Sequence, residues 1–379
     1  MKFVHLSDLH IGKRVNEYSM LEDQEYILAQ ILDVIDKAAV DAVIIAGDVY
    51  DKSVPSAEAV EMFDDFLVKL ATRKLPTFVI SGNHDSPERI AFGGRLMTGS
   101  KIYMSPVYNG KTEPVTLEDE FGEINIYMLP FVKPANVRRF YPDSEIASYT
   151  DAIKVAVENM DIDTKKRNIL VTHQFVTGAD RTESEDISVG GTDNVDVTAF
   201  ADFDYVALGH IHRAQKCSFE TVRYSGTPLK YSFSEAKDKK SVTILEINEK
   251  GNVGIDFIDL IPLRDMKEIK GTYNEIMQKS FYEGTTYDKD YMHITLTDEE
   301  DIPDAIGKLR TVYHNLMKLD YDNQRTKQNS IIESDFDVET KSPIELFEEL
   351  YLLQNNVEMS DKQKEYMQDL IEEVWEGGK

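Results

Sequence analysis

Cysteine is almost absent from the sequence, which contains only Cys217 among 379 residues. A single cysteine excludes a disulfide within the chain, and we expect Cys217 to be a small, partly buried side chain rather than a nucleophile. Long hydrophobic runs are also absent. None approaches the roughly 18 residues of a membrane-spanning helix, and the first residues lack the basic-then-apolar layout of a signal peptide. We therefore expect a soluble, cytoplasmic protein.

Basic residues are scarce, since 42 Lys and Arg face 69 Asp and Glu and the formal net charge is −27. This balance argues against tight, unaided binding of nucleic acid, whose phosphates are recognised largely by Lys and Arg. Many carboxylates lie in the C-terminal third, and bound divalent cations would reverse the charge locally, so nucleic acid stays open as a substrate. The length and the 41% hydrophobic content are ordinary for a globular chain of two or three domains.

The first part of the chain alternates strands with helices. Nearly continuous apolar runs predict buried strands, and the segments between them have the periodicity of amphipathic helices. The predicted strands are 2–7, 41–46, 77–80, 125–130, 168–172 and 203–208, and the predicted helices are 20–38, 57–70 and 148–160. This order predicts an α/β fold with helices flanking a sheet. Later β segments at 221–226, 241–247 and 254–262 suit the second half of a two-sheet β-sandwich.

A domain boundary is expected near Pro262. We expect a core over 1–262, a small α+β domain over 263–320, a polar linker over 321–341 and a helical segment over 342–379. In the small domain the pattern predicts a helix at 273–279, a strand at 291–296 and a helix at 304–317. The last segment contains two amphipathic helices, from 342 and from 362 to 375. The pattern leaves open whether they form a packed hairpin or dock on a partner.

Polar side chains follow five of the predicted strands at their carboxyl ends. Gly209 ends one strand and precedes His210 and His212, two imidazoles that can point the same way. The other strand ends carry Asp8 and His10, Asp48, Asn83 with His84 and Asp85, and His173. Because sites in α/β sheets form beyond the carboxyl ends of strands, we expect these groups to converge. A lone His-x-His pair would equally suit a surface loop, and the other four strand ends favour a site.

The chemistry of this set points to metal ions. Its members are carboxylates, imidazoles and one amide, without a thiolate, which favours Mn, Fe or Zn over Ca or a structural thiolate zinc. Seven ligands are too many for one ion and suit two ions that share a carboxylate.

In chain order the pattern is Asp-x-His, Gly-Asp, Gly-Asn-His-Asp, a single His and Gly-His-x-His. It resembles the pattern of the calcineurin-like metallophosphoesterases. The resemblance implies a dinuclear site with Asp8, His10 and His212 on one metal ion, Asn83, His173 and His210 on the other, and Asp48 bridging. It also implies that His84 protonates or stabilises the leaving oxygen, whereas Asp85 either orients His84 or caps its loop.

Further stretches are similar to the SbcD family of bacterial nuclease subunits. They are residues 5–12, 47–51, 189–191, 204–212, 224–229, 232–235 and 262–266. The resemblance implies a manganese-dependent DNA exonuclease and endonuclease that acts on duplex ends and hairpins in DNA repair and recombination. It also implies that 263–320 forms a capping domain that positions DNA. Asp51 departs from the archaeal and eukaryotic relatives, which carry a histidine near the metals.

The same resemblance implies two protein partners. A coiled-coil ATPase, SbcC, would dock through residues 342–379 and supply the basic DNA-binding surface. A homodimer would form through helices at 57–70 and 90–97, and burial of that apolar face within the chain is the competing account. Lys13, Arg14 and Arg89 are more typical of solvated surface charge than of phosphate contacts.

Two alternative functions are compatible with parts of the sequence. The first is a metallophosphoesterase that acts on cyclic nucleotides or other small phosphodiesters, which the small domain and terminal helices disfavour. The second is a scaffold with a vestigial metal site, which the complete ligand set disfavours.

Overall fold

The structure is a computed structural model that describes residues 1–185, 194–300, 302–323, 343–355, 358–360, 362–364, 366–368 and 370. Its internal contacts divide the chain into two units. The first comprises Met1–Ile269, Met277–Ile294 and Asp304–Leu319, and the second comprises Lys270–Ile276, Thr295–Pro303 and the residues from Asp320 onward. Among the described residues, no helix is long and apolar enough to cross a membrane. The domain boundaries expected at 262, 320 and 341 stay a prediction.

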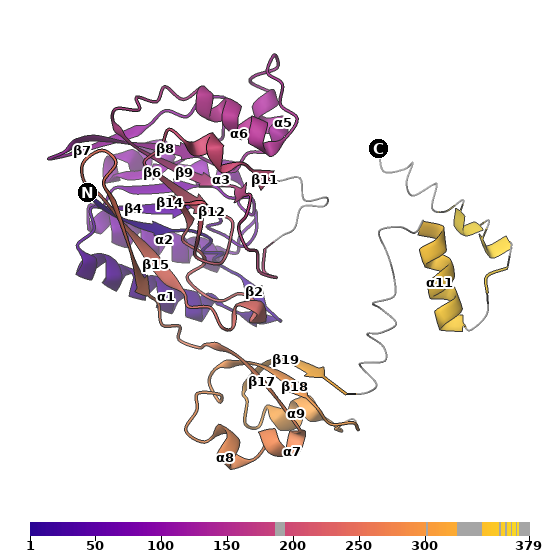
Figure 1. Cartoon of the computed structure of the whole chain (residues 1–379). Coiled ribbons are helices and arrows are strands. Elements are labelled where there is room, and N and C mark those ends of the chain that lie inside the picture. The colour runs from indigo at the N-terminus through magenta and orange to yellow at the C-terminus, as the bar shows by residue number, and fades with distance from the viewer. Residues whose placement is uncertain are drawn as a thin grey trace. The chain divides into compact units, whose positions relative to one another are not determined.

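The first unit is built on two six-stranded sheets (Figure 1). The first sheet has the order β16 (Val253–Asp259), β15 (Ser241–Ile247), β1 (Lys2–Leu6), β4 (Ala42–Ala46), β5 (Thr77–Ile80) and β6 (Ile102–Met104). The second has the order β13 (Gln215–Cys217), β14 (Phe219–Tyr224), β12 (Tyr205–Gly209), β9 (Arg167–His173), β8 (Gly122–Leu129) and β7 (Val115–Asp119). Strands β1, β4, β5 and β6 are parallel, as are β14, β12, β9 and β8.

Helices and short elements connect these strands. The helices are α1 (Leu21–Ala38), α2 (Ala57–Thr72), α3 (Pro87–Ala91), α4 (Gly94–Met97), α5 (Pro134–Arg138) and α6 (Tyr149–Glu158). The short strands are β2 (Arg14–Val15), β3 (Tyr18–Ser19), β10 (Phe175–Val176) and β11 (Asn194–Val195). Short 3₁₀ helices are η1 (Thr98–Ser100), η2 (Val197–Phe200) and η3 (Phe233–Glu235).

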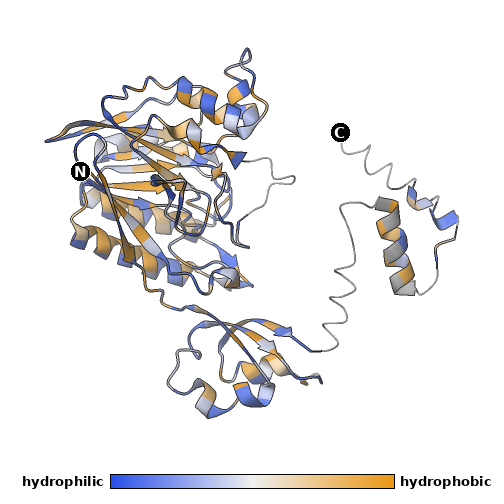
Figure 2. Ribbon diagram, viewed as in Figure 1, coloured by the Kyte–Doolittle hydropathy of each residue, from blue (hydrophilic) through white to orange (hydrophobic). Residues whose placement is uncertain are grey.

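Three hydrophobic clusters define the layers of the sandwich. The cluster between the sheets takes alternate residues of both, such as Ile44 of β4 and Ile169 of β9. The residues next to these face outward, because successive side chains of a strand point to opposite faces. Val43 therefore packs with α1 and α2, and Leu170 packs with α6. Figure 2 shows the resulting hydrophobic strands and more hydrophilic loops. The predicted α/β two-sheet sandwich flanked by helices is confirmed.

The sequence pattern suggested that the late strands would together form the second half of the sandwich. In the structure they are divided between the two sheets. Only β14 joins the second sheet, whereas β15 returns to the first sheet, pairs antiparallel with β1 and carries β16 at the edge. Hydrophobic alternation shows that a segment is a strand with one or two buried faces, but both sheets offer such faces. The choice of sheet therefore depends on the tertiary path of the chain.

The small domain contains more strand than predicted. It has β17 (Met266–Gly271), α7 (Tyr273–Ile276), α8 (Lys279–Tyr282), β18 (Tyr291–Leu296), α9 (Ala305–Leu309) and β19 (Asn315–Tyr321), with a three-stranded sheet in the order β17-β18-β19. The helix predicted over 304–317 is wrong beyond Leu309. The run Thr311-Val312-Tyr313 has low helix propensity, and the following residues gain hydrogen bonds at the sheet instead.

The C-terminal segment is described only in part. Helix α11 (Pro343–Asn355) begins at the predicted proline. Lys364 pairs with Glu348 at 3.1 Å, and the Gln363 amide donates to the Tyr351 hydroxyl at 3.0 Å, so these two stretches lie side by side. Most of the predicted linker, the 189–191 motif and residues 371–375 of the last predicted helix lie outside the described residues.

Candidate metal centre

The nine predicted site residues follow five strands whose carboxyl ends meet. β1, β4 and β5 are parallel neighbours in one sheet, and β9 and β12 are parallel neighbours in the other. In register, Gly209 of β12 pairs with His173 at the end of β9. Parallel strands bring their carboxyl ends to the same edge of a sheet, so the residues that follow them converge.

Four of these residues adopt a backbone conformation that is unusual for a side-chain-bearing residue. Asp8, His10, Asp48 and His210 have φ values of 53°, 45°, 49° and 108°. Left-handed backbone in non-glycine residues persists only where surrounding contacts enforce it, and it concentrates at functional sites. Here the Asp8 amide donates to the Gly47 carbonyl at 3.0 Å, and the His210 amide donates to the Asp8 carboxylate at 3.0 Å. Hydrogen bonds thus connect the loop after β1 to the loops after β4 and β12.

One group of ligand atoms consists of Asp8, His10 and His212. The three side chains are buried, and their nearest ligand atoms all lie within 4.8 Å of one another. The Nε2 atoms of His10 and His212 are 3.1 Å apart, so both cannot carry a hydrogen on these facing atoms. Two imidazole nitrogens facing each other at this distance suit a shared cation.

A second group consists of Asn83, His173 and His210. The Asn83 side-chain Oδ1 lies 2.9 Å from His173 Nε2 and 2.9 Å from His210 Nδ1. His173 is held from its other side, because its Nδ1 lies 2.9 Å from the Ala46 carbonyl oxygen at the end of β4. That contact directs Nε2 towards the cluster.

Asp48 lies between the two groups. One carboxylate oxygen is 3.3 Å from His173 Nε2 and 3.7 Å from His10 Nε2, and the other accepts from the His84 amide at 2.9 Å. The structure therefore brings together all seven residues expected to bind metal, with Asp48 in the middle. Which ion each one holds stays a prediction.

His84 and Asp85 are placed differently. The His84 ring stacks edge-on against His10 with centroids 4.8 Å apart, and its Nδ1 lies 3.1 Å from the Asp51 carbonyl oxygen. The Asp85 carboxylate accepts from the amides of Val49, Tyr50 and Gly82 at 2.9–3.1 Å. Asp85 thus joins the loops after β4 and β5, which supports the loop-capping interpretation over the orienting one. The catalytic assignment of both residues stays a prediction.

The electrostatics of the cluster favour a bound cation. Burial raises the pKa of Asp8 to about 7. Burial would lower the pKa of His173, but the adjacent Asp48 carboxylate raises it to about 9. For Asp48 burial opposes ionisation, yet His173 and His10 hold its pKa well below the usual range. The buried carboxylates of this cluster are thus stabilised by protons, either their own or those of the neighbouring imidazoles. A divalent ion can take the place of these protons and supply the positive charge instead.

Lys13 is a residue that sequence reasoning undervalued. Its ammonium pairs with Asp51 at 2.7 Å and lies 5.6 Å from the centroid of the Tyr231 ring, which itself packs against His10. Lys13 is therefore a mostly buried cation beside the cluster rather than solvated surface charge. In the sequence, the only sign of this role is the position of Lys13 in the loop between β1 and α1. The ion pair itself could not be predicted, because Asp51 is 38 residues away in the chain.

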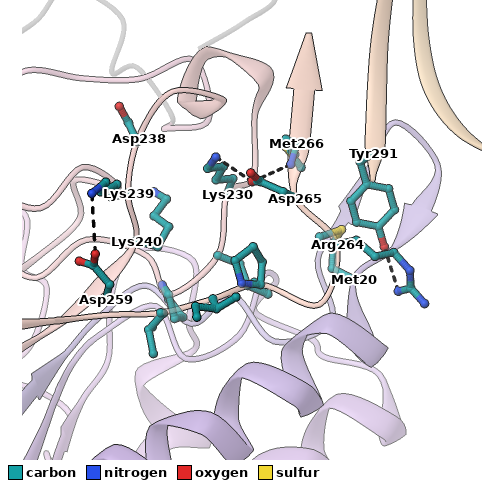
Figure 3. A pocket seen from close by; sticks show the side chains of 15 residues that line it. Met20, Lys230, Asp238, Lys239, Lys240, Asp259, Arg264, Asp265, Met266 and Tyr291 are labelled. Carbon is teal, nitrogen blue, oxygen red and sulfur yellow. Dashed lines mark hydrogen bonds and ion pairs between the residues drawn. The ribbon is translucent and has the colours of Figure 1, made fainter. Parts of the chain in front are cut away.

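A cavity of about 210 Å³ lies beside the site rather than at it (Figure 3). Its walls come from residues 228–230, 238–240 and 259–262 with Met20, Arg264–Met266 and Tyr291. The charged side chains drawn there are largely paired, as for Lys230 with Asp265 at 2.7 Å. The metal cluster, not this cavity, therefore carries the candidate chemistry.

Comparison with known proteins agrees with this geometry. The family model for calcineurin-like phosphoesterases matches residues 1–214, which contain every residue of the cluster. A second family model, the type 5 capsule protein repressor C-terminal domain, matches residues 262–355. The chain therefore belongs to the calcineurin-like phosphoesterase family.

A curated relative makes the assignment more specific. The chain is 34% identical over 323 residues to the SbcD subunit of the nuclease SbcCD of Staphylococcus epidermidis, and the match covers 84% of this chain and 85% of that protein. It is thus a homologue of SbcD, as the sequence motifs indicated. Among solved structures, a dimetal phosphatase from Danio rerio aligns with 9% identity and a TM-score of 0.40 over 68% of this chain and 95% of that one. TT1561 of Thermus thermophilus aligns with 10% identity and a TM-score of 0.36 over 68% and 98%.

Proposed function

We propose that the chain is the nuclease subunit of an SbcCD-type complex and hydrolyses DNA phosphodiester bonds at duplex ends and hairpins with two manganese ions. The observation that carries this proposal is the convergence of seven oxygen- and nitrogen-bearing side chains, six of them buried, in two groups on either side of Asp48, in a chain homologous to SbcD. A cytoplasmic location is part of the proposal because DNA is its substrate.

The residues present fit two divalent ions. Asp8, His10 and His212 would hold one, Asn83, His173 and His210 the other, and Asp48 would contact both. When bound, such ions polarise phosphoryl oxygens and make a water molecule available as nucleophile near neutral pH. The carboxylate, imidazole and amide set suits manganese better than calcium.

The protein's own contribution is to position groups around the phosphate. The Asp51 carbonyl near Nδ1 of His84 orients the ring, and this imidazole would protonate the leaving oxygen. Lys13 and Arg14 line a polar cleft together with Lys237 and with Ser184 and Tyr231, which adjoin the cluster. These cations would contact phosphates of the DNA strand, although the chain as a whole is acidic.

The proposed partners rest on exposed apolar side chains. Docking of SbcC through 342–379 is supported by Leu350 and Leu352 of α11, which are partly exposed. A homodimer through α2 and the α3–α4 segment is supported by Phe92 and Leu96, which are 83% and 87% exposed. Much of the apolar face of α2, including Phe66 and Leu70, is instead buried in the chain's own core, so the dimer contact would use the remainder.

The test compares cleavage and metal binding in matched variants. Mn²⁺ is titrated against labelled duplex DNA, hairpin DNA and a generic phosphodiester, with and without SbcC. Asp48→Asn should lose Mn²⁺ binding and cleavage together, since it loses the shared carboxylate. His84→Ala should keep Mn²⁺ binding and lose about 10²–10⁴-fold in cleavage, as expected for a general acid. Asp33→Asn, on the exposed face of α1, is the control and should match the wild type.

Two outcomes would contradict the proposal. Equal DNA cleavage by the wild type, Asp48→Asn and His84→Ala would show that the site is misassigned. Hydrolysis of the small phosphodiester without DNA cleavage, even with SbcC present, would favour the small-phosphodiester alternative.

A further inference from the structure

A buried ion pair next to the metal cluster takes no part in the proposed hydrolysis. Glu235 is fully buried, and the Lys240 side chain is only 6% exposed, yet the two charges meet at 2.5 Å. Lys240 comes from the wall of the cavity in Figure 3, and Glu235 ends the 232–235 motif. Buried pairs are costly to desolvate, so a retained pair calls for a structural or positioning explanation.

The side chains of this pair form hydrogen bonds with His212 itself and with two residues that contact His212. Besides Glu235, the Lys240 ammonium donates to the His212 carbonyl at 2.9 Å and to the Thr227 hydroxyl at 2.8 Å. The other Glu235 oxygen accepts from the Ser184 hydroxyl at 2.5 Å. Ser184 Oγ in turn lies 2.6 Å from Nδ1 of His212. The pair therefore contacts His212 both directly and through one hydroxyl group.

The chain of contacts determines where the protons lie. The Ser184 hydroxyl lies 2.7 Å from the Thr182 hydroxyl as well, and either of those two oxygens could donate to the other. Because Glu235 is paired with an ammonium group and acts as a charged acceptor at the shorter distance of 2.5 Å, we assign the single Ser184 proton to Glu235. With its proton directed to Glu235, Ser184 Oγ acts as an acceptor towards both the Thr182 hydroxyl and His212, which places a hydrogen on Nδ1 of His212. A neutral imidazole with Nδ1–H has its lone pair on Nε2, the atom that faces His10 in the metal cluster.

The backbone of His212 is held in the same way. Its amide donates to the Glu185 carboxylate at 2.7 Å, and its carbonyl accepts from Lys240 and from the Thr227 amide. Ser184 and Glu185 are adjacent in sequence, so one short stretch contacts both the backbone and the ring of His212. This arrangement restricts both the position and the rotation of the ring.

We propose that Ser184, oriented by the Glu235–Lys240 pair, is a positioning residue that holds His212 as the Nδ1–H tautomer with Nε2 directed into the metal centre. The inference rests on the proposed function, in which His212 is a metal ligand. Removing a hydrogen-bond acceptor that lies behind a ligating histidine commonly changes metal affinity by about 10- to 100-fold.

The test measures the tautomer of His212 and the affinity for Mn²⁺ separately. Ring ¹⁵N shifts of histidine-labelled, cation-free full-length protein report which nitrogen carries hydrogen, with His212→Gln used for assignment. Ser184→Ala should mix the two tautomers and weaken Mn²⁺ binding about 10- to 100-fold. Ser184→Thr retains a hydroxyl and should restore both. Ser234→Ala is the matched control, because Ser234 Oγ accepts from the Glu183 amide in the same stretch without touching His212.

The outcomes separate this inference from the proposed function. An Nε2–H tautomer in the wild type, or unchanged tautomer and affinity in Ser184→Ala, would overturn the role of Ser184. Equal losses in Ser184→Ala and Ser234→Ala would also overturn it, because they would show that only loop placement matters. If His212→Gln binds Mn²⁺ like the wild type, His212 is not a metal ligand. In that case Ser184 cannot act by directing Nε2 of His212 to a metal ion.

Discussion

Two histidines at the start of the chain show how strongly environment decides a residue's role. His10 lies beyond the end of β1, with Nε2 in the metal cluster. His5 lies inside β1, fully buried between the sheets, and its Nδ1 contacts the Tyr205 hydroxyl at 3.0 Å. In the described part of the structure the Nε2 of His5 has no hydrogen-bond partner. The position of a histidine relative to the strand end thus separates a core residue from a candidate ligand.

His5 should make the protein less stable in acid. Burial lowers the pKa of His5 to about 3. Between about pH 6.5 and pH 3 the unfolded chain binds a proton at this residue and the folded chain does not. The free energy of unfolding should therefore fall as the pH decreases through this window, by up to about 1.4 kcal/mol per pH unit from His5. His5→Asn retains a polar atom but cannot titrate, so its stability should depend less on pH.

Urea unfolding of both proteins at several pH values, with a chelator present, measures this difference. Other groups that titrate contribute to both curves and cancel. Parallel curves for His5→Asn and the wild type would show that His5 is not responsible.

At the scale of elements, the site exists because two strand ends from different sheets approach each other closely. Gly209 at the end of β12 faces Ala46 at the end of β4, and a Cβ atom on Gly209 would overlap the Ala46 carbonyl oxygen. The absence of a side chain therefore allows the two sheets to meet where the ligands emerge.

Gly209→Ala should damage both stability and the site. Overpacking a filled region costs about 1–3 kcal/mol, and here the strain falls on backbone that cannot rotate away. Because His210 follows directly, Mn²⁺ affinity should decrease as well. Gly99→Ala is the control, since nothing lies within 4 Å of its Cβ position, and it should change stability by less than about 0.5 kcal/mol. Equal unfolding free energies and Mn²⁺ affinities for the two variants would contradict this account of the close approach.

At the scale of the whole molecule, the candidate metal centre lies where the two sheets meet, so a bound ion would couple their stability to cations. Its candidate ligands lie at or just beyond the carboxyl ends of β1, β4 and β5 in one sheet and of β9 and β12 in the other. An ion held between these strand ends would bind only the folded chain, because unfolding separates its ligands.

Removing divalent ions should therefore lower the melting temperature. A ligand at 100 times its dissociation constant adds about 2.7 kcal/mol to the free energy of unfolding. Calorimetry with Mn²⁺ and with a chelator should show the increase for the wild type and a much smaller one for Asp48→Asn. A similar increase in Asp48→Asn would indicate that the stabilising ions bind elsewhere.

Much of the fold and the candidate site could be predicted because the signals are local. The apolar runs of β1, β4 and β5 and the polar residues directly after them are contiguous in sequence. The predicted helix over 304–317 failed because neighbouring strands outweighed a weak helical preference. The roles of Lys13 and Ser184 could not be predicted, since the contacts of Lys13 with Asp51 and of Ser184 with His212 and Glu235 join residues that lie 28 to 51 positions apart in the chain.

The sequence by itself determined the α/β class, the family and the identity of the residues that converge, because strand ends and their ligands follow one another directly. Only the tertiary structure decided that β15 returns to the first sheet, that Asp48 lies between two groups, and that Ser184 links His212 to a buried ion pair. Those arrangements depend on distances between segments that are far apart in the chain, and such distances are set by packing of the whole core.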